Sequence, residues 1–298
     1  MRGEIGSATI CLPPDWWQQA QTAKILSQWF ERYVLPLALS FRHRAQPYRE
    51  VATGFLIDVS GHLLWLTAGH VVRELGLVLT RPDYAVERML WLDRWDIPGA
   101  EALPAHNRDP RMYSEYGEGI DIGALHISGL DECHLRQGQR VEIMSEQAWS
   151  NLHLSRPEGY YLIGYPREWK QVDSDTLSGR GTRVSLSVTL ACLPVQRIRR
   201  PSPDREEGWD DPDAFYGEIL AYAKGDEDQP RDIVGMSGGP LFSIERDVRD
   251  RLRYHLVGLQ ASWSSSKRQI RVEPIERVVE RVRQWLEEQP EQLNASRL

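Results

Sequence analysis

Short apolar segments separated by turn residues recur along most of the chain, and they limit its fold more than any other feature of the sequence. They lie at residues 51–59, 63–67, 89–92, 122–127, 141–144, 160–164, 184–193, 214–222 and 255–260. Brief apolar runs bounded by turn residues are typical of β-strands, and many in succession are typical of β-barrels and sandwiches. The sequence therefore predicts an all-β core.

The predicted strands fall into two groups, on either side of a loop-rich stretch near residues 145–158. The chain has 298 residues, of which 41% are apolar, so it can form one large domain or two modest ones. We expect the first β half to cover residues 46–150 and the second half to cover residues 151–298.

Helical patterns are predicted at both ends of the chain. Residues 1–45 are expected to form a helical N-terminal extension, because apolar residues recur there at spacings of three and four, up to a break or kink at Pro36. This apolar stripe consists of Trp16, Ala20, Ala23, Leu26, Phe30, Tyr33 and Leu37. We expect the stripe to pack on the protein's own body, while docking of a regulatory protein partner stays open. A second amphipathic helix is expected between Pro274 and Pro290.

Composition excludes several classes of function. The net charge of −7 argues against a nucleic-acid-binding surface, which usually carries a basic stripe. No segment approaches the ~20 apolar residues that span a bilayer, and residues 1–15 lack the apolar core of a secretory signal. The three cysteines, Cys11, Cys133 and Cys192, are too widely spaced to indicate a disulfide framework or a metal site. We therefore expect a cytoplasmic protein that binds neither nucleic acid nor membrane.

Residues 201–213 are rich in proline and acidic side chains, and they interrupt the second half. This composition predicts an exposed loop. Connecting segments often carry function, so a flap over a cleft is the alternative interpretation.

Ser237 is the candidate nucleophile, because glycines surround it in the stretch Gly-Met-Ser-Gly-Gly-Pro at residues 235–240. Glycine permits tight turns and close approach of the backbone, so a serine here can be held exposed. The N–H groups beside it can converge on one point, as stabilisation of an oxyanion requires. An ordinary tight turn, or the nucleophile elbow of α/β-hydrolases, would fit the same six residues.

A serine hydroxyl needs an adjacent base to act as a nucleophile. Of the eight histidines, His70 is the best candidate, because it follows an apolar strand and two small residues. Asp121 stands at the head of another apolar strand, where a carboxylate is costly to bury unless a group such as an imidazole N–H pairs with it. A structural histidine and an exposed turn aspartate are the alternatives. An α/β-hydrolase would need the order serine, acid, histidine. This alternative is disfavoured, because the only histidine after Ser237 is His255, which lies in a predicted strand.

Three segments taken together, TGFLI…LLWLTAGHVV, DIGALHI and GMSGGPLF, resemble the chymotrypsin/trypsin-like serine proteases, which share the order His, Asp, Ser. The resemblance covers roughly residues 48–271. It implies two six-stranded antiparallel β-barrels, the first holding His70 and Asp121 and the second holding Ser237, followed by a C-terminal helix. Residues 161–166 look like an early strand of the second barrel in HtrA-type bacterial relatives.

The resemblance implies a serine endopeptidase that cleaves proteins or peptides through an acyl-enzyme, without a metal or cofactor. Ser237 would attack the carbonyl, His70 would carry the proton, Asp121 would orient His70, and the Gly235 and Ser237 amides would form the oxyanion hole. The residue before the nucleophile is Met236, which cannot form the ion pair that activates digestive trypsins, so activation by N-terminal cleavage is not expected.

Substrate preference is less constrained. By the resemblance, Arg231 would lie at the floor of the substrate pocket, where Asp232 could neutralise it, and Ala261 and Trp263 would lie at its edge. Trp263 would narrow the pocket so that it accepts small side chains. The alternative is that Trp263 is an aromatic residue of the rim or of the core. The alternative function is a catalytically silent scaffold that binds peptides or protein partners. Such a scaffold would lack a triad residue, and all three are present.

Overall fold

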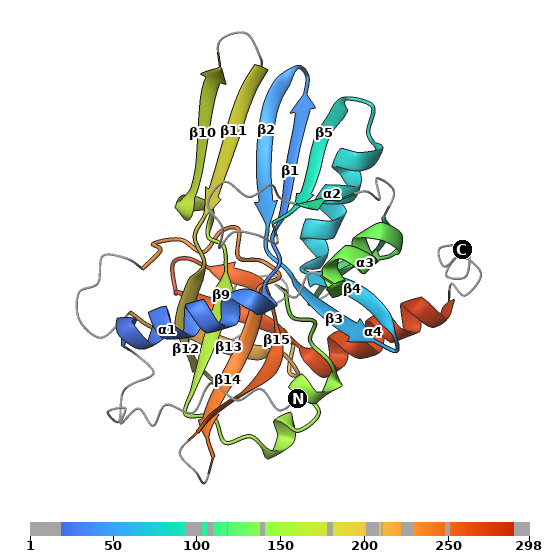
Figure 1. The fold of residues 1–298 in the computed structure, drawn as a ribbon. Coiled ribbons are helices and arrows are strands. Elements are labelled where there is room, and N and C mark those ends of the chain that lie inside the picture. The colour runs from blue at the N-terminus through green and yellow to red at the C-terminus, as the bar shows by residue number, and fades with distance from the viewer. Residues whose placement is uncertain are drawn as a thin grey trace.

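The computed structural model describes residues 19–92, 103–105, 110–117, 119–137, 141–177, 181–200, 209, 211–221, 229–247 and 251–288, with only the backbone of residues 170–177 and 181–187. It is mostly β-structure, with helices on its surface (Figure 1). Within these residues, no helix has the length and apolar character needed to cross a bilayer.

The second half forms a closed six-stranded barrel with the strand order β12-β13-β16-β15-β14-β9. All of its paired strands are antiparallel, and β9 closes the ring by pairing with both β12 and β14. This confirms a β-barrel for this half. Its strands are β9 (Gly159–Gly164), β12 (Ala191–Arg197), β13 (Phe215–Ile219), β14 (Pro240–Arg246), β15 (Leu252–Ser264) and β16 (Gln269–Pro274).

A separate hairpin of β10 (Lys170–Leu177) and β11 (Gly181–Val188) is inserted between β9 and β12. It projects from the same end of the molecule as the hairpin of β1 and β2 (Figure 1). The single strand predicted over residues 184–193 is therefore divided between β11 and β12.

The first half contains two four-stranded sheets, with the orders β2-β1-β5-β6 and β3-β4-β8-β7. They share an apolar core, and an isolated bridge between Val34 and Phe55 links their edges. Among the described residues the ladders do not close this half, so a first closed barrel stays a prediction. The strands are β1 (Leu37–His43), β2 (Gln46–Ala52), β3 (Phe55–Val59), β4 (His62–Thr67), β5 (Tyr84–Trp91), β6 (Leu103–Pro104), β7 (Arg111–Gly117) and β8 (Ile120–Ile127).

The strand predicted over residues 51–59 is broken at Gly54, where the chain passes from one sheet to the other. A Cβ at Gly54 would lie 2.3 Å from the Trp65 ring, so only glycine lets this buried indole pack against the backbone. The hairpin of β3 and β4 follows, and its two-residue turn places Ser60 and Gly61 at positive φ, as a type I′ turn requires.

The N-terminal helix α1 (Ala20–Phe30) continues into a 3₁₀ turn, η2 (Glu31–Tyr33). Its predicted stripe packs on the protein's own body: Phe30 is fully buried and stacks on Phe242 of β14 at 4.3 Å between ring centroids. The helix is shorter than predicted, because Leu37 begins β1. Residues 1–18, including Trp16, lie outside the described residues.

Three further α-helices lie within the described residues. The C-terminal helix α4 (Ile275–Glu288) begins directly after Pro274, as predicted. Helices α2 (Gly69–Thr80) and α3 (Gly129–Gln137) were not expected from the strand pattern. The strand predicted at residues 141–144 is absent, apart from one bridge between Ile57 and Met144. Short 3₁₀ turns lie at η3 (Glu146–Ala148), η4 (Leu152–Leu154) and η5 (Arg167–Trp169).

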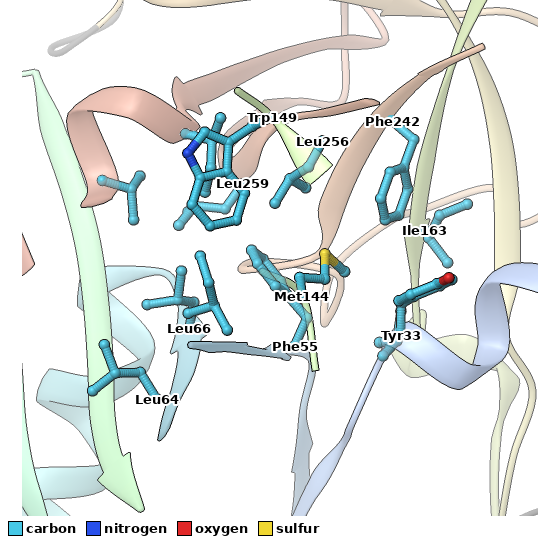
Figure 2. Close-up of a cluster of buried hydrophobic side chains, with 14 of the residues drawn as sticks. Tyr33, Phe55, Leu64, Leu66, Met144, Trp149, Ile163, Phe242, Leu256 and Leu259 are labelled. Carbon is cyan, nitrogen blue, oxygen red and sulfur yellow. The ribbon is translucent and has the colours of Figure 1, made fainter. Parts of the chain in front are cut away.

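A continuous apolar core joins the two halves (Figure 2). The first half and η2 supply one side of it, the barrel supplies the other, and the connecting segment between the halves lies between them. The junction is therefore packed like a domain interior, which fixes the groups that meet along it. The side chains labelled in Figure 2 are Tyr33, Phe55, Leu64, Leu66, Met144, Trp149, Ile163, Phe242, Leu256 and Leu259.

Candidate active site

The Ser237 segment folds into two successive tight turns. The Met236 N–H donates to the Ile233 carbonyl at 2.9 Å, and the Gly239 N–H donates to the Met236 carbonyl at 2.8 Å. The third residues of these turns are Gly235 and Gly238, with φ of 95° and 85°. A positive φ at this position is the signature of a type II turn, which explains the glycine spacing around the serine.

This geometry leaves specific amides without a partner. Neither central N–H of a tight turn bonds within that turn, so four amides need acceptors elsewhere. The Asp232 carboxylate binds one at 3.0 Å and the Gln260 carbonyl binds another at 2.8 Å. Among the described residues, the amides of Gly235 and Ser237 have no acceptor. These are the two donors that the sequence predicts for an oxyanion hole.

Both halves of the molecule hold this turn. The Thr53 hydroxyl, from the first half, donates to the Gly235 carbonyl at 2.7 Å. Gly238 lies against the end of β4, where a Cβ would come within 2.1 Å of Thr67 Oγ1 and 2.8 Å of the Ala68 nitrogen. The turn that carries Ser237 is thus pressed against the two residues that lead into α2.

His70 and Asp121 lie in direct contact. His70 Nδ1 is 2.8 Å from Asp121 Oδ2, and the His70 backbone N–H donates to Asp121 Oδ1, also at 2.8 Å. His70 is in the first turn of α2, where backbone amides lack intrahelical acceptors and favour a negative charge. The Asp121 side chain is 3% exposed and that of His70 is 29% exposed, so the acid is buried and the imidazole reaches solvent.

The surroundings of His70 act on its pKa in opposite directions. Burial lowers the pKa, while the hydrogen bond and the charge of Asp121, with a smaller contribution from Glu74, raise it. The net pKa lies above the ordinary value of 6.5. With Nδ1 engaged by Asp121, Nε2 is the ring nitrogen left to act as a base.

The structure therefore brings His70 and Asp121 together and places the Ser237 turn beside the start of α2. Within the described part of the chain, no hydrogen bond joins the Ser237 hydroxyl to the His70 ring. Bonds between nucleophile and base are commonly long in unliganded sites and tighten when substrate binds.

Of the three predicted pocket residues, Ala261 and Trp263 lie in β15, whereas the backbone N–H of Arg231 donates to Glu168 of η5. Arg231 is exposed, Ala261 is buried within the strand, and Trp263 is half-buried. The Trp263 indole N–H donates to the Asp232 carboxylate at 3.1 Å, so this acid is bound to the ring. Their roles in specificity stay predictions.

Of the predicted loop at residues 201–213, the structure describes Trp209 and residues 211–213. Trp209 is buried, and Asp211 forms an ion pair with Arg277 of α4. Whether the loop covers a cleft depends on residues outside the described part of the chain.

Two site residues were missed by sequence reasoning. Glu273 Oε1 accepts a hydrogen bond from the Asp121 backbone N–H at 3.1 Å, and Arg271 donates to the Gly119 carbonyl. The segment from Ile270 to Glu273 alternates apolar and charged residues, which normally indicates a strand with one face in water. Here both charged residues are buried. The sequence feature that could have indicated them is a pair of charged residues in a short segment that ends at Pro274.

The arrangement is suited to nucleophilic acyl transfer: a buried acid, a base in contact with it, and a serine beside two amides that have no acceptor in the described part of the chain. Among the described residues, no group of three or more His, Cys, Asp or Glu side chains could hold a metal ion.

No protein-family model matches the chain, and no curated protein matches it. Solved structures with similarity include the active form of the Rv3671c protease from M. tuberculosis, with 15% identity over 93% of this chain and 91% of that chain, at a TM-score of 0.41. The protease Anisep from Arthrobacter nicotinovorans has 12% identity over 82% and 90%, at 0.39. A thermostable serine protease, AL20, from an extremophilic microorganism has 10% identity over 82% and 91%, at 0.41. Similarity at this level is too low to carry a functional conclusion.

Proposed function

We propose that this protein is a serine endopeptidase that hydrolyses peptide bonds through His70, Asp121 and Ser237. One observation carries the proposal: the 2.8 Å contact between His70 Nδ1 and Asp121 Oδ2 lies beside the turn in which the Gly235 and Ser237 amides have no acceptor among the described residues. A structural histidine alone would not account for a neighbouring serine turn in which two amide donors have no acceptor within the residues that the structure describes.

In the proposed reaction, Ser237 Oγ bonds to the carbonyl carbon of the substrate while its proton passes to His70 Nε2. The carbonyl oxygen becomes an oxyanion and accepts hydrogen bonds from the Gly235 and Ser237 amides. The C–N bond then breaks, and His70 returns the proton to the leaving amine. A water molecule then attacks the resulting ester while its proton passes to His70 Nε2. The bond between the carbonyl carbon and Ser237 Oγ breaks, and His70 returns the proton to Ser237 Oγ. Asp121 stabilises the imidazolium that forms in both steps.

The magnitudes expected for these roles are large. One oxyanion donor typically lowers the barrier by about 3–4 kcal/mol. Loss of the nucleophile or the base typically reduces kcat by a factor on the order of 10⁶.

The proposal extends to the fold and the setting. We assign residues 46–150, together with β1, to the first barrel of a chymotrypsin-like protease, and residues 151–298 to the second barrel and the C-terminal helix. Residues 161–166 are the feature that favours an HtrA-type member. The substrate is a protein or peptide, and the wide spacing of the three cysteines favours the cytoplasm. A regulatory partner would bind through the N-terminal extension outside α1, because the stripe on α1 is buried in the core.

A fluorophosphonate probe tests the proposal, because it forms a covalent bond only with an activated serine. We expect labelling of the wild-type protein, and no labelling of Ser237→Ala or His70→Ala. Cleavage of an unfolded protein substrate should follow the same pattern. If pure, folded protein is unlabelled between pH 7 and 9, alone and with cell lysate added, the protein is a silent scaffold instead.

A further inference from the structure

Strand β16 carries a buried pair of charged side chains on the face that meets the first half. Arg271 and Glu273 are two residues apart, so they lie on the same face of the strand. Their side chains are 3% and 0% exposed, and Arg271 Nη1 donates to Glu273 Oε1 at 2.8 Å. Burying such a pair is costly and rarely increases stability over an apolar pair, so its contacts need another explanation.

These side chains hold the backbone on either side of Ile120. Glu273 Oε1 accepts from the Asp121 N–H at 3.1 Å, and Arg271 Nη1 donates to the Gly119 carbonyl. One acceptor and one donor from the second half therefore grip two peptide groups of the first half. One of these peptide groups contains the N–H of Asp121, whose carboxylate contacts His70.

The carboxylate of Glu273 is itself held in place. Its other oxygen, Oε2, accepts from Arg277 of α4 at 3.2 Å. Arg277 also binds Asp211 through both of its terminal nitrogens. Both oxygens of Glu273 are thus engaged, which fixes the direction in which Oε1 meets the Asp121 amide.

We propose that Glu273, supported by Arg271, is a positioning residue that holds the Asp121 backbone so that the carboxylate of Asp121 meets His70. This inference rests on the proposed function for its catalytic consequence. The contact between Asp121 and His70 can be tested without any assay of hydrolysis.

Two matched variants separate the effect of side-chain length at position 273 from the effect of its charge. Glu273→Gln keeps one acceptor oxygen for the Asp121 amide, and removes the charge and the acceptor that Arg277 uses. Glu273→Asp keeps the charge and withdraws the carboxylate by about 1.5 Å, the length of one C–C bond. The charged groups that face Glu273 are Arg271, Arg277 and Asp211, while those that face His70 are Asp121 and Glu74.

The first readout is the titration of the His70 imidazole, followed by NMR in the wild-type protein and both variants. Asp121 raises the pKa of His70 against the lowering effect of burial. In Glu273→Asp the contact loosens, so we expect the pKa of His70 to fall toward or below 6.5. In Glu273→Gln it should stay at the wild-type value.

The second readout is kcat per active site, counted by fluorophosphonate labelling. Misplacement of a catalytic group by about 1 Å can reduce the rate about 100-fold, so we expect a loss of about 10- to 100-fold in kcat for Glu273→Asp. KM should change little, because Asp121 does not touch the substrate. Glu273→Gln should retain most of the activity.

A purely structural role would lower the unfolding temperature of both variants and leave the His70 titration and kcat per site unchanged. That result overturns the inference, as does a variant pair in which Glu273→Gln is impaired and Glu273→Asp is not. If the wild-type protein hydrolyses nothing and yet Glu273→Asp shifts the His70 titration, the proposed function fails and the positioning role stands. If Glu273→Asp does not fold, Arg271→Lys, which withdraws the donor from Gly119, is expected to shift the titration in the same direction, and an unshifted titration overturns the inference.

Discussion

Substituting Gly238 by alanine should damage the molecule in two separable ways. At φ of 85° an alanine is in the left-handed region, which costs about 1–2 kcal/mol. Its Cβ would also lie 2.1 Å from Thr67 Oγ1 and 2.6 Å from Thr67 Cα, and overpacking of this kind costs about 1–3 kcal/mol. Together the two effects amount to about 2–5 kcal/mol, a large part of the ~5–15 kcal/mol that stabilises a typical domain.

Gly61→Ala is the matched control. Gly61 has a nearly identical φ of 84°, in the turn between β3 and β4, and a Cβ there would meet nothing within 4 Å. It should therefore lose only the backbone part, about 1–2 kcal/mol, and keep its hydrolytic activity. In Gly238→Ala the clash also displaces the Ser237 turn, so kcat per labelled site should fall at least about 100-fold.

Urea unfolding of both variants measures the free energies, and active-site labelling with a peptide substrate measures the rates. The reasoning is refuted if Gly238→Ala is as stable as Gly61→Ala and as active as the wild-type protein. Equal stability would mean that β4 yields to the new methyl group, so that the contact with Thr67 is not rigid.

Three further predictions concern the acid–base pair and the N-terminal helix. The base form of His70 is neutral and its pKa is raised, so kcat/KM should fall with decreasing pH at a midpoint above 6.5, and Glu74→Gln should move that midpoint down; a flat profile to pH 5 contradicts the assignment. Asp121→Asn should reduce kcat by about 10⁴-fold, because an amide donor holds the imidazole in the wrong tautomer, and a loss below tenfold in a peptide assay would argue against the pairing. Phe30→Ala should cost about 3–5 kcal/mol in urea unfolding, since its ring is fully buried, whereas Ile25→Ala on the exposed side should cost little; equal losses would mean that α1 does not dock as described.

The sequence was most informative where chemistry and geometry are set locally. Glycines at third positions of two consecutive turns follow directly from the φ that those turns need, so six residues were enough to indicate a tight turn at Ser237, while its interpretation as a nucleophile needed the His70 and Asp121 segments as well. Four of the six strands of the second barrel, β9, β12, β13 and β15, were predicted at least in part, because they carry their own apolar pattern and turn signals, whereas β14 and β16 were not predicted.

Helix α2 could not be recognised in this way, because its start lacks a local capping residue. Ala68 stands at the N-cap and makes no side-chain hydrogen bond to the helix. The acceptor comes from Asp121, 51 residues further along the chain, and it binds the His70 amide. A helix whose cap is supplied from another strand carries no start signal in its own sequence.

The burial of Arg271 and Glu273 was hidden for a related reason. Alternation of charged and apolar residues predicts a strand with one face exposed to solvent. The charged face of β16 is buried because the first half packs against it. The break at Gly54 is similar, because it depends on where the Trp65 ring lies and not on a turn signal in residues 51–59.

The contacts across the junction also bear on synthesis of the chain. A protein emerges from the ribosome N-terminus first, so Asp121 and Ser237 are made before Glu273 and Arg277. Until β16 and α4 have emerged, the Asp121 amide lacks the acceptor that Glu273 provides. A growing chain thus contains His70, Asp121 and Ser237 for some time before Glu273 can hold the backbone of Asp121 in place.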